Sequence, residues 1–200
     1  MLNKVRKASS ADTGRLAVSL ARAFDDDPVI NWLARKDNKR VHGIESLFRT
    51  CIADLCLQHD HVLTTEDLSG GALWYPPGTS KISLIRQLFL ANKMIPFAGW
   101  TGLLRLAMSQ DKAHKKRPEG KNYYLQFIGV DPKNRGRGTG AALLKPILDI
   151  CDAGKCGAYL ESSKETNIGF YRRFGFEVTG KIVLGKGAPP VWTMWRSPKS

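Results

Sequence analysis

The chain has 200 residues, enough for a single domain with its own hydrophobic core and no stabilising metals or disulfides. Hydrophobic residues make up 42% and charged residues 24% of the sequence, which excludes a collagen-like or largely disordered protein. Lysine and arginine outnumber aspartate and glutamate by 31 to 18, and the resulting net charge of +13 favours anionic ligands.

In the first half of the chain, the pattern of apolar residues predicts three strands and two helices. The strands are expected at 5–9, 61–65 and 71–75, and the helices at 11–24 and 38–58. Ser10 offers an N-cap for the first helix, and Asp25–Pro28 breaks its apolar pattern. The second helix is long and amphipathic, so one of its faces is expected to pack on the core.

In the second half, a helical segment comes first, and strands then alternate with helices. Apolar residues at helical spacing extend over 80–110, with interruptions at Pro96 and Gly99–Gly102, and a polar loop is expected at 111–121. Further strands are expected at 122–130, 157–162, 176–184 and 191–196, and helices at 139–153 and 167–174. The sequence therefore predicts one α+β domain over residues 1–200, with a mixed central sheet of about six to seven strands and helices on both faces.

Cysteine spacing, charge distribution and hydropathy limit the partners of this domain. The four cysteines form two pairs that lack the spacing of a zinc site, so we expect no metal. Basic residues cluster only at Lys112–Arg117, without interleaved aromatic residues, so we expect no nucleic acid. The longest uncharged apolar run, Met94–Leu104, is about half of a bilayer span, so we expect no membrane partner. Free thiols and the lack of a signal peptide favour a cytoplasmic protein.

A glycine-rich turn joins a predicted buried strand to a predicted helix. Its glycines, Gly136, Gly138 and Gly140, allow the backbone to approach a ligand closely and to adopt positive φ. The free N–H groups and the dipole of the helix that follows form an anion site that suits a pyrophosphate. Arg135 and Arg137 add charge-assisted donors to that site.

Two other phosphate-binding motifs do not fit the chain. The glycines of the turn are spaced G-x-G-x-G, whereas a dinucleotide-binding turn requires G-x-G-x-x-G. The stretch Gly175–Lys181 has P-loop spacing, but Ile182 replaces the Ser or Thr that would hold magnesium. We therefore exclude both motifs.

Two motifs resemble those of the GCN5-related N-acetyltransferase (GNAT) superfamily. The run Arg135-x-x-Gly138-x-Gly140, after a strand that ends in Val130-x-Pro132, resembles its acetyl-CoA signature. The run Asn167-x-x-Phe170-Tyr171-x-x-x-Gly175-Phe176 resembles its second motif. From Tyr124 onward the chain is similar to puromycin N-acetyltransferase-like enzymes, whereas the likeness is poor at 76–121. We expect this variable helical segment to line the acceptor pocket.

The resemblance implies that acetyl-CoA is the co-substrate and that strand residues 127–130 splay from their neighbour to bind its pantetheine arm. A main-chain N–H near Phe127 or Ile128 would polarise the thioester carbonyl. Tyr171 matches the general acid, because a phenol with a pKa near ~10 keeps its proton at neutral pH. Asn167 is also expected to be the N-cap of its short helix. The implied acetyl-CoA-binding residues are Phe127, Ile128, Gly129, Val130, Arg135, Gly136, Arg137, Gly138, Thr139, Gly140, Asn167 and Tyr171.

The acceptor side of the site has several candidate residues. Glu161, at a strand end, is the candidate general base, and it is equally interpreted as a partly buried structural acid. Asp26 could attract the substrate ammonium, although Asp25–Asp27 is equally a turn that ends a helix. The apolar candidates for acceptor contacts, which are also candidates for the core, are Trp74, Leu88, Phe89, Met94, Phe97 and Trp100.

The sequence thus predicts an enzyme that transfers acetyl from acetyl-CoA directly to the primary amine of a small molecule. Direct transfer is expected because no motif for a covalent nucleophile is present. Two alternatives stay open: the acceptor is a protein or peptide amine, or the chain is a non-catalytic acyl-CoA-binding module. We expect a monomer or a homodimer.

Overall fold

The computed structural model describes residues 4–79, 84–114, 117–118 and 120–199. Its helices are α1 (Thr13–Ala23), α2 (Pro28–Leu33), α3 (Arg40–Thr50), α4 (Leu84–His114), α5 (Thr139–Ala153) and α6 (Ile168–Arg172). Its strands are β1 (Val5–Lys7), β2 (Val62–Thr65), β3 (Gly70–Tyr75), β4 (Asn122–Val130), β5 (Gly157–Ser162), β6 (Glu177–Val183) and β7 (Pro190–Arg196). Within these described ranges, no helix is long and apolar enough to cross a membrane.

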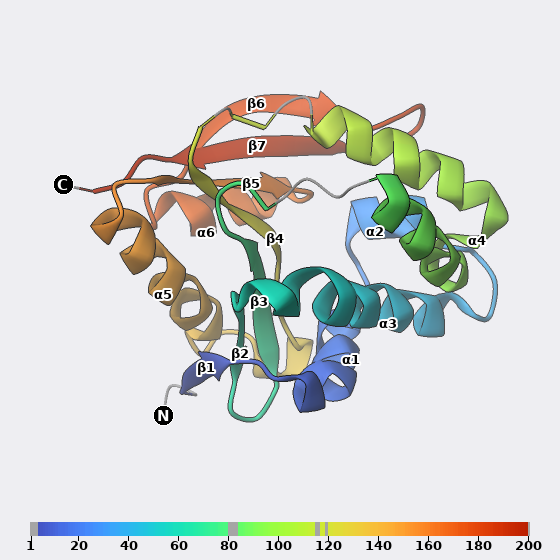
Figure 1. The fold of residues 1–200 in the computed structure, drawn as a ribbon, viewed down its shortest axis with the longest axis horizontal. Helices are drawn as coiled ribbons and strands as arrows, with labels where there is room; N and C mark the ends of the chain where they lie inside the picture. The colour runs from blue at the N-terminus through green and yellow to red at the C-terminus, as the bar shows by residue number, and fades with distance from the viewer. Residues whose placement is uncertain (1–3, 80–83, 115–116, 119, 200) are drawn as a thin grey trace.

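The strands form one seven-stranded mixed sheet in the order β1-β2-β3-β4-β5-β7-β6. Neighbouring strands are antiparallel except β4 and β5, which are parallel. Figure 1 shows α5 and α6 on one side of this sheet and α1 to α4 on the other. The prediction of an α+β fold with a mixed sheet of six to seven strands and helices on both faces is confirmed.

Strand residues alternate between two hydrophobic cores, one on each face of the sheet. On the side of α1 and α3, Leu73 and Tyr159 belong to the first core. On the side of α5, Trp74 and Leu160 belong to the second. Successive side chains of a strand point to opposite faces, so each central strand supplies both cores. Within one strand, the alternation of side chains therefore decides which helices each residue contacts.

Strands β4 and β5 diverge part-way along their length. Their last residue pair is Leu125↔Leu160, and beyond it β4 pairs only with β3. A register shift in the β3–β4 ladder leaves Gln126 without a partner, and a bulge of this kind bends and twists its strand. The two strands consequently separate at their carboxyl ends, and we call this opening the β4–β5 wedge. It is the splay expected for residues 127–130.

Local structure differs from the prediction after α1. The segment Asp25–Pro28 ends α1, as expected, but it also starts α2. The Asp27 carboxylate accepts hydrogen bonds from the N–H groups of Val29 and Ile30, both at 2.9 Å. Pro28 occupies the first position of α2, where no N–H is required, so this segment combines two helix-start signals.

Two other predicted boundaries are also corrected, and a third is found as predicted. The first helical turn is capped by Ser9 rather than Ser10, because the Ser9 N–H donates to the Asp12 carboxylate at 2.8 Å in a capping box. Helix α4 continues to His114, into the predicted loop, because no proline or glycine stops it there. The predicted interruption at Gly99 is present as a non-helical residue with a φ of +64°.

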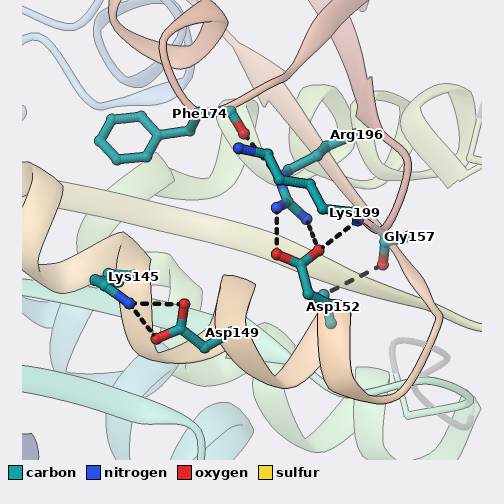
Figure 2. A network of polar contacts seen from close by, with 8 residues as sticks. Lys145, Asp149, Asp152, Gly157, Phe174, Arg196 and Lys199 are labelled. Atoms are coloured by element: carbon teal, nitrogen blue, oxygen red, sulfur yellow. Dashed lines mark hydrogen bonds and ion pairs between the residues drawn. The ribbon is translucent and has the colours of Figure 1, made fainter.

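The C-terminal strand is fixed to α5 by a buried arginine (Figure 2). Arg196, only 3% exposed, donates two hydrogen bonds to the Asp152 carboxylate at 2.8 and 2.7 Å. Its Nε donates to the carbonyl of Phe174 at 2.8 Å, which connects β7 to the segment after α6. Hydrogen bonds from Arg196 are the main cause that lowers the pKa of Asp152 from 3.8 to about 2.

Replacing Arg196 with Ala is expected to lower the free energy of unfolding by about 3 kcal/mol, because it leaves a carboxylate without its partner at a partly buried position. The contribution is present above the ordinary Asp pKa and is lost as pH falls towards 2, since protonation of Asp152 breaks the pair. Urea denaturation at pH 7 and pH 3 measures both effects. Lys145→Ala, which removes the exposed Lys145–Asp149 pair drawn in Figure 2, is the control and should cost under ~0.5 kcal/mol. A loss equal to that of the control would contradict the prediction.

Candidate active site

The glycine-rich turn lies at the open end of the β4–β5 wedge, between the end of β4 and the start of α5. Gly136 and Gly138 have φ angles of +80° and +76°, which residues with a side chain rarely adopt. Gly138 is the N-cap of the 15-residue helix α5, and no described side chain caps this helix. Its first N–H groups therefore remain available, and they suit a pyrophosphate.

Gly140 differs from the other two glycines of the turn. A Cβ atom on Gly140 would lie 3.3 Å from the Phe170 ring, so its small size lets α6 pack closely on α5. Thr139, at the start of α5, is buried. These two residues therefore position the start of the helix, whereas Gly136 and Gly138 shape the turn itself.

The two arginines of the turn occupy different environments. The Arg135 guanidinium donates to the carbonyl of Ala23 at 2.9 Å and to that of Val130 at 3.3 Å. It thereby ties the turn to the ends of α1 and β4. Arg137 is exposed on the same turn. Of the two, Arg137 is the better placed to meet a phosphate group in solution.

The strand that borders the wedge is fixed by packing on its two faces. The Phe127 ring lies 5.5 Å from Phe24 and 5.1 Å from Phe48, measured between ring centroids. A Cβ atom on Gly129 would lie 2.8 Å from Phe24, so glycine is required for α1 to pack this closely. Ile128 and Val130 pack on the opposite core, under α5. The edge of this strand that faces β5 has no strand partner in the described structure.

Glu161 is the first residue of β5 beyond its last pair with β4, and it therefore lies at the apex of the wedge. Its carboxylate accepts hydrogen bonds from the hydroxyls of Tyr159 at 3.1 Å and Tyr124 at 3.3 Å. Burial raises the pKa of Glu161, and the charge of Arg117 and the two hydroxyls oppose that rise. The partners are side-chain hydroxyls rather than the main-chain N–H groups expected of a structural acid.

Tyr171 lies on α6, on the opposite side of the sheet from Glu161. Its side chain is buried, and its ring centroid is 6.0 Å from that of Phe176. Burial raises the pKa of Tyr171 well above its usual range, and the charge of Asp27 adds to this rise. The phenol therefore keeps its proton at neutral pH, as a general acid must.

The acidic run before α2 contains two differently placed carboxylates. Asp26 forms an ion pair with Lys164 at 2.7 Å, and the Lys164 hydrogen bond lowers the pKa of Asp26. This pairing weakens its attraction for a substrate ammonium. Asp27 is buried and accepts a hydrogen bond from the hydroxyl of Ser163, just after β5. Burial raises the pKa of Asp27. Asp27, which the sequence did not single out, is thus the buried carboxylate of this run and is bonded to the segment just after β5.

Two sequence-predicted site residues have other roles in the structure. Trp74 is completely buried under α5, on the opposite face of the sheet from Glu161 and Tyr159. Trp74 thus has the core role that the sequence also allowed, and its contact with the acceptor stays a prediction. Asn167 closes a short 3-10 turn and has helical dihedral angles, and its side chain makes no capping hydrogen bond. Asn167 therefore stands at the predicted N-cap position of α6, but its side chain does not cap the helix, because a side-chain N-cap requires an extended residue before the helix.

Comparison with known proteins identifies the domain. Residues 87–178 match the family described as the acetyltransferase (GNAT) domain. The chain carries a GNAT acetyltransferase domain. An uncharacterized N-acetyltransferase of Schizosaccharomyces pombe is 27% identical over 98% of this chain and 83% of its own length. The recognition of the superfamily from its two motifs is confirmed, and the chain is an N-acetyltransferase.

Solved structures agree with this acetyltransferase fold. A Corynebacterium glutamicum protein described as histone acetyltransferase HPA2 and related acetyltransferase superposes with a TM-score of 0.78 at 22% identity, covering 100% of this chain and 98% of that one. Arylalkylamine N-acetyltransferase 2 of Aedes aegypti superposes with a TM-score of 0.64 at 15% identity, covering 98% and 99%. At these identities the likeness concerns the fold.

The segment 76–121 of the acetyltransferase contributes both core and surface residues. Met94 and Phe97 of α4 belong to the core on the side of α1 and α3. Trp100 is 77% exposed and lies on the surface. The side chains of Leu88 and Phe89, also candidates for the acceptor pocket, lie outside the described residues. The lining of an acceptor pocket by this segment stays a prediction.

Three residues around Glu161 were not singled out from the sequence of the acetyltransferase. Tyr159 precedes Glu161 by two positions, and the period of a strand places both side chains on one face. That signal was available in the sequence. Tyr124 and Arg117 carried no such signal, because they reach Glu161 only through the pairing of β4 with β5 and through the segment before β4.

Proposed function

We propose that this N-acetyltransferase moves the acetyl group of acetyl-CoA directly to the primary amine of a small molecule in the β4–β5 wedge. The observation that carries the proposal is the position of Glu161 as the first β5 residue inside the wedge. The uncapped start of α5 lies at the open end of the same wedge. An anion site and a candidate base thus border one opening in the sheet.

The residues at the wedge fit acetyl-CoA. The N–H groups at the start of α5, with Arg137, would hold the pyrophosphate, and Gly136 and Gly138 leave no side chain in its way. The unpaired edge of residues 127–130 would hold the pantetheine arm through backbone hydrogen bonds. Acetyl-CoA supplies the thioester that the amine attacks, and a main-chain N–H near Phe127 or Ile128 would stabilise the developing oxyanion.

Two side chains would move the protons of the reaction. The Glu161 carboxylate accepts a proton from the attacking amine, which must be neutral at nitrogen to react. The Tyr171 hydroxyl donates a proton to the departing thiolate, and its raised pKa keeps that proton available at neutral pH. Asp27 lies close enough to Tyr171 to affect its titration, and it could help to attract the ammonium form of the substrate.

The surroundings of Glu161 favour a small acceptor. Tyr159 is fully buried and Tyr124 is 5% exposed, so the carboxylate lies among buried aromatic side chains, and we infer that a substrate approaches it between them. A slender primary amine fits such an approach, whereas an amine on a folded protein requires an open groove. The similarity to puromycin N-acetyltransferase-like enzymes makes puromycin one compound to test.

Release of coenzyme A thiol from acetyl-CoA tests the proposal across a panel of puromycin, polyamines, aminoglycosides, amino acids and basic peptides. We expect turnover of at least one small amine, and a fall in kcat of about 10²-fold in Tyr171→Phe, which removes the proton donor. Tyr123→Phe is the matched control, because Tyr123 packs on the same core as Tyr171 but lies beside β5 in its paired part. It should keep full activity.

Each outcome of the panel has a distinct meaning. Turnover of the basic peptides alone would replace the small-molecule acceptor with a protein or peptide. Tight acetyl-CoA binding without turnover of any amine would contradict the catalytic proposal for this panel and favour a binding module. Equal activity in Tyr171→Phe and the native protein would remove Tyr171 from the acid role.

A further inference from the structure

The Glu161 carboxylate is held symmetrically by two tyrosines from neighbouring strands. The Tyr159 hydroxyl of β5 donates to one carboxylate oxygen at 3.1 Å, and the Tyr124 hydroxyl of β4 donates to the other at 3.3 Å. The register pairs Tyr124 with Tyr159 directly, so the sheet itself brings the two phenols together. Each carboxylate oxygen keeps a further lone pair, which can accept a proton from a substrate.

The two phenols are held in place by their neighbours. Tyr159 has no exposed surface, and its ring centroid lies 5.8 Å from that of Tyr124. Tyr124 stacks on Tyr75 at 6.1 Å with an interplanar angle of 8°. On Tyr124, the guanidinium of Arg117 lies 3.7 Å from the ring centroid, in cation–π contact. Packing of this kind leaves the hydroxyls little freedom to turn away from Glu161.

The charges around Glu161 act in opposite directions. Burial disfavours the carboxylate and raises its pKa, whereas Arg117, from the segment before β4, and the hydroxyls of Tyr159 and Tyr124 lower it. Among the described residues, these are the ionisable groups that act on this carboxyl. Burial also raises the pKa of both phenols, so they remain protonated and act only as donors. Without these groups, burial would favour the neutral form of the carboxyl still more, and the neutral form cannot act as a base.

We propose that Tyr124 and Tyr159 are positioning residues that hold Glu161 ionised and oriented at the wedge. Arg117, in cation–π contact with the Tyr124 ring, supports them. The proposal rests on the proposed function, in which Glu161 is the base. It assigns to the two hydroxyls a role in the reaction rather than in stability alone. Loss of either hydroxyl makes the carboxylate harder to ionise, so the base becomes active only at higher pH.

The test is the pH dependence of kcat/KM for Tyr124→Phe, Tyr159→Phe and the double variant. We expect the midpoint of the acidic limb of the kcat/KM profile to move to higher pH by about half a pH unit or more for each lost hydroxyl, and further in the double variant. Activity should recover at high pH, because the base remains in place. The titration of the amine substrate is common to all variants, so differences between them report the enzyme. Arg117→Gln should move the limb in the same direction.

Controls separate this role from a structural one. Tyr123→Phe, next to Tyr124 but on the opposite face of β4, should leave the limb where it is in the native protein. Thermal unfolding confirms that each variant is folded. The ¹³C shift of the Glu161 carboxyl, assigned by its absence in Glu161→Gln, follows the same titration without substrate. We expect its midpoint to move upward in both Phe variants.

The outcomes distinguish this inference from the proposed function. An unmoved limb and an unmoved ¹³C midpoint in the Phe variants, with Glu161→Gln inactive, would overturn the positioning role and leave the base role standing. A fully active Glu161→Gln would overturn both. A limb that moves in the Phe variants but not in Tyr123→Phe would support the inference.

Discussion

Replacing Glu161 with Gln is expected to lower kcat/KM at pH 8 by about 10²- to 10³-fold, because the amide cannot accept the proton of the attacking amine. The KM for acetyl-CoA should change little, since Glu161 lies at the apex of the wedge and the proposed anion site, the uncapped start of α5, lies at its open end. Thiol release with the best amine of the panel measures both constants. This is the variant that separates a base from a structural acid most directly.

The stability of the same variant gives an independent result. The raised pKa of Glu161 means that its ionised form opposes folding, increasingly so as pH rises above the ordinary glutamate pKa of 4.5. Gln removes that unfavourable charge, so the unfolding midpoint at pH 8 should equal or exceed that of the native protein, and the difference should vanish at pH 4. Lost activity with unchanged or higher stability is expected of a functional residue. A clear loss of stability with little loss of activity would instead make Glu161 a structural acid.

Replacing Gly138 with Ala is expected to raise the KM for acetyl-CoA about tenfold or more. Gly138 caps α5 with a φ of +76°, and a side chain there costs about 1 to 2 kcal/mol or forces the turn to change shape. Either response moves the N–H groups that would hold the pyrophosphate. Steady-state kinetics with varied acetyl-CoA, together with direct binding of coenzyme A by calorimetry, measures the effect.

Gly187→Ala is the matched control for this substitution. Gly187 also has a positive φ, +73°, but lies in the connection between β6 and β7, and a Cβ there would meet no atom within 4 Å. Both variants should lose a similar amount of stability, and only Gly138→Ala should lose affinity for acetyl-CoA. If both variants bind acetyl-CoA equally well, the turn before α5 is not the site of its phosphates.

The sequence by itself determined the features that depend on neighbouring residues. The glycine-rich turn, the helix α5 after it and the strands on either side are encoded by short-range signals: glycine spacing, apolar periodicity and an uncapped helix start. The same signals carried the superfamily motifs, which the family match confirms. Short-range signals were ambiguous where one residue has two meanings, as at Asp27, which ends one helix and caps the next.

Only the tertiary structure decided which side chains meet. The bulge at Gln126 sets where β4 leaves β5, and this makes Glu161 the first residue inside the wedge. The same register pairs Tyr124 with Tyr159, and the alternation along β3 removes Trp74 to the far face. These contacts join residues far apart in the chain through strand register, and a shift of one position would send each side chain to the other face. The sequence therefore determined the fold and the glycine-rich turn, whereas the register of the folded sheet decided the surroundings of Glu161.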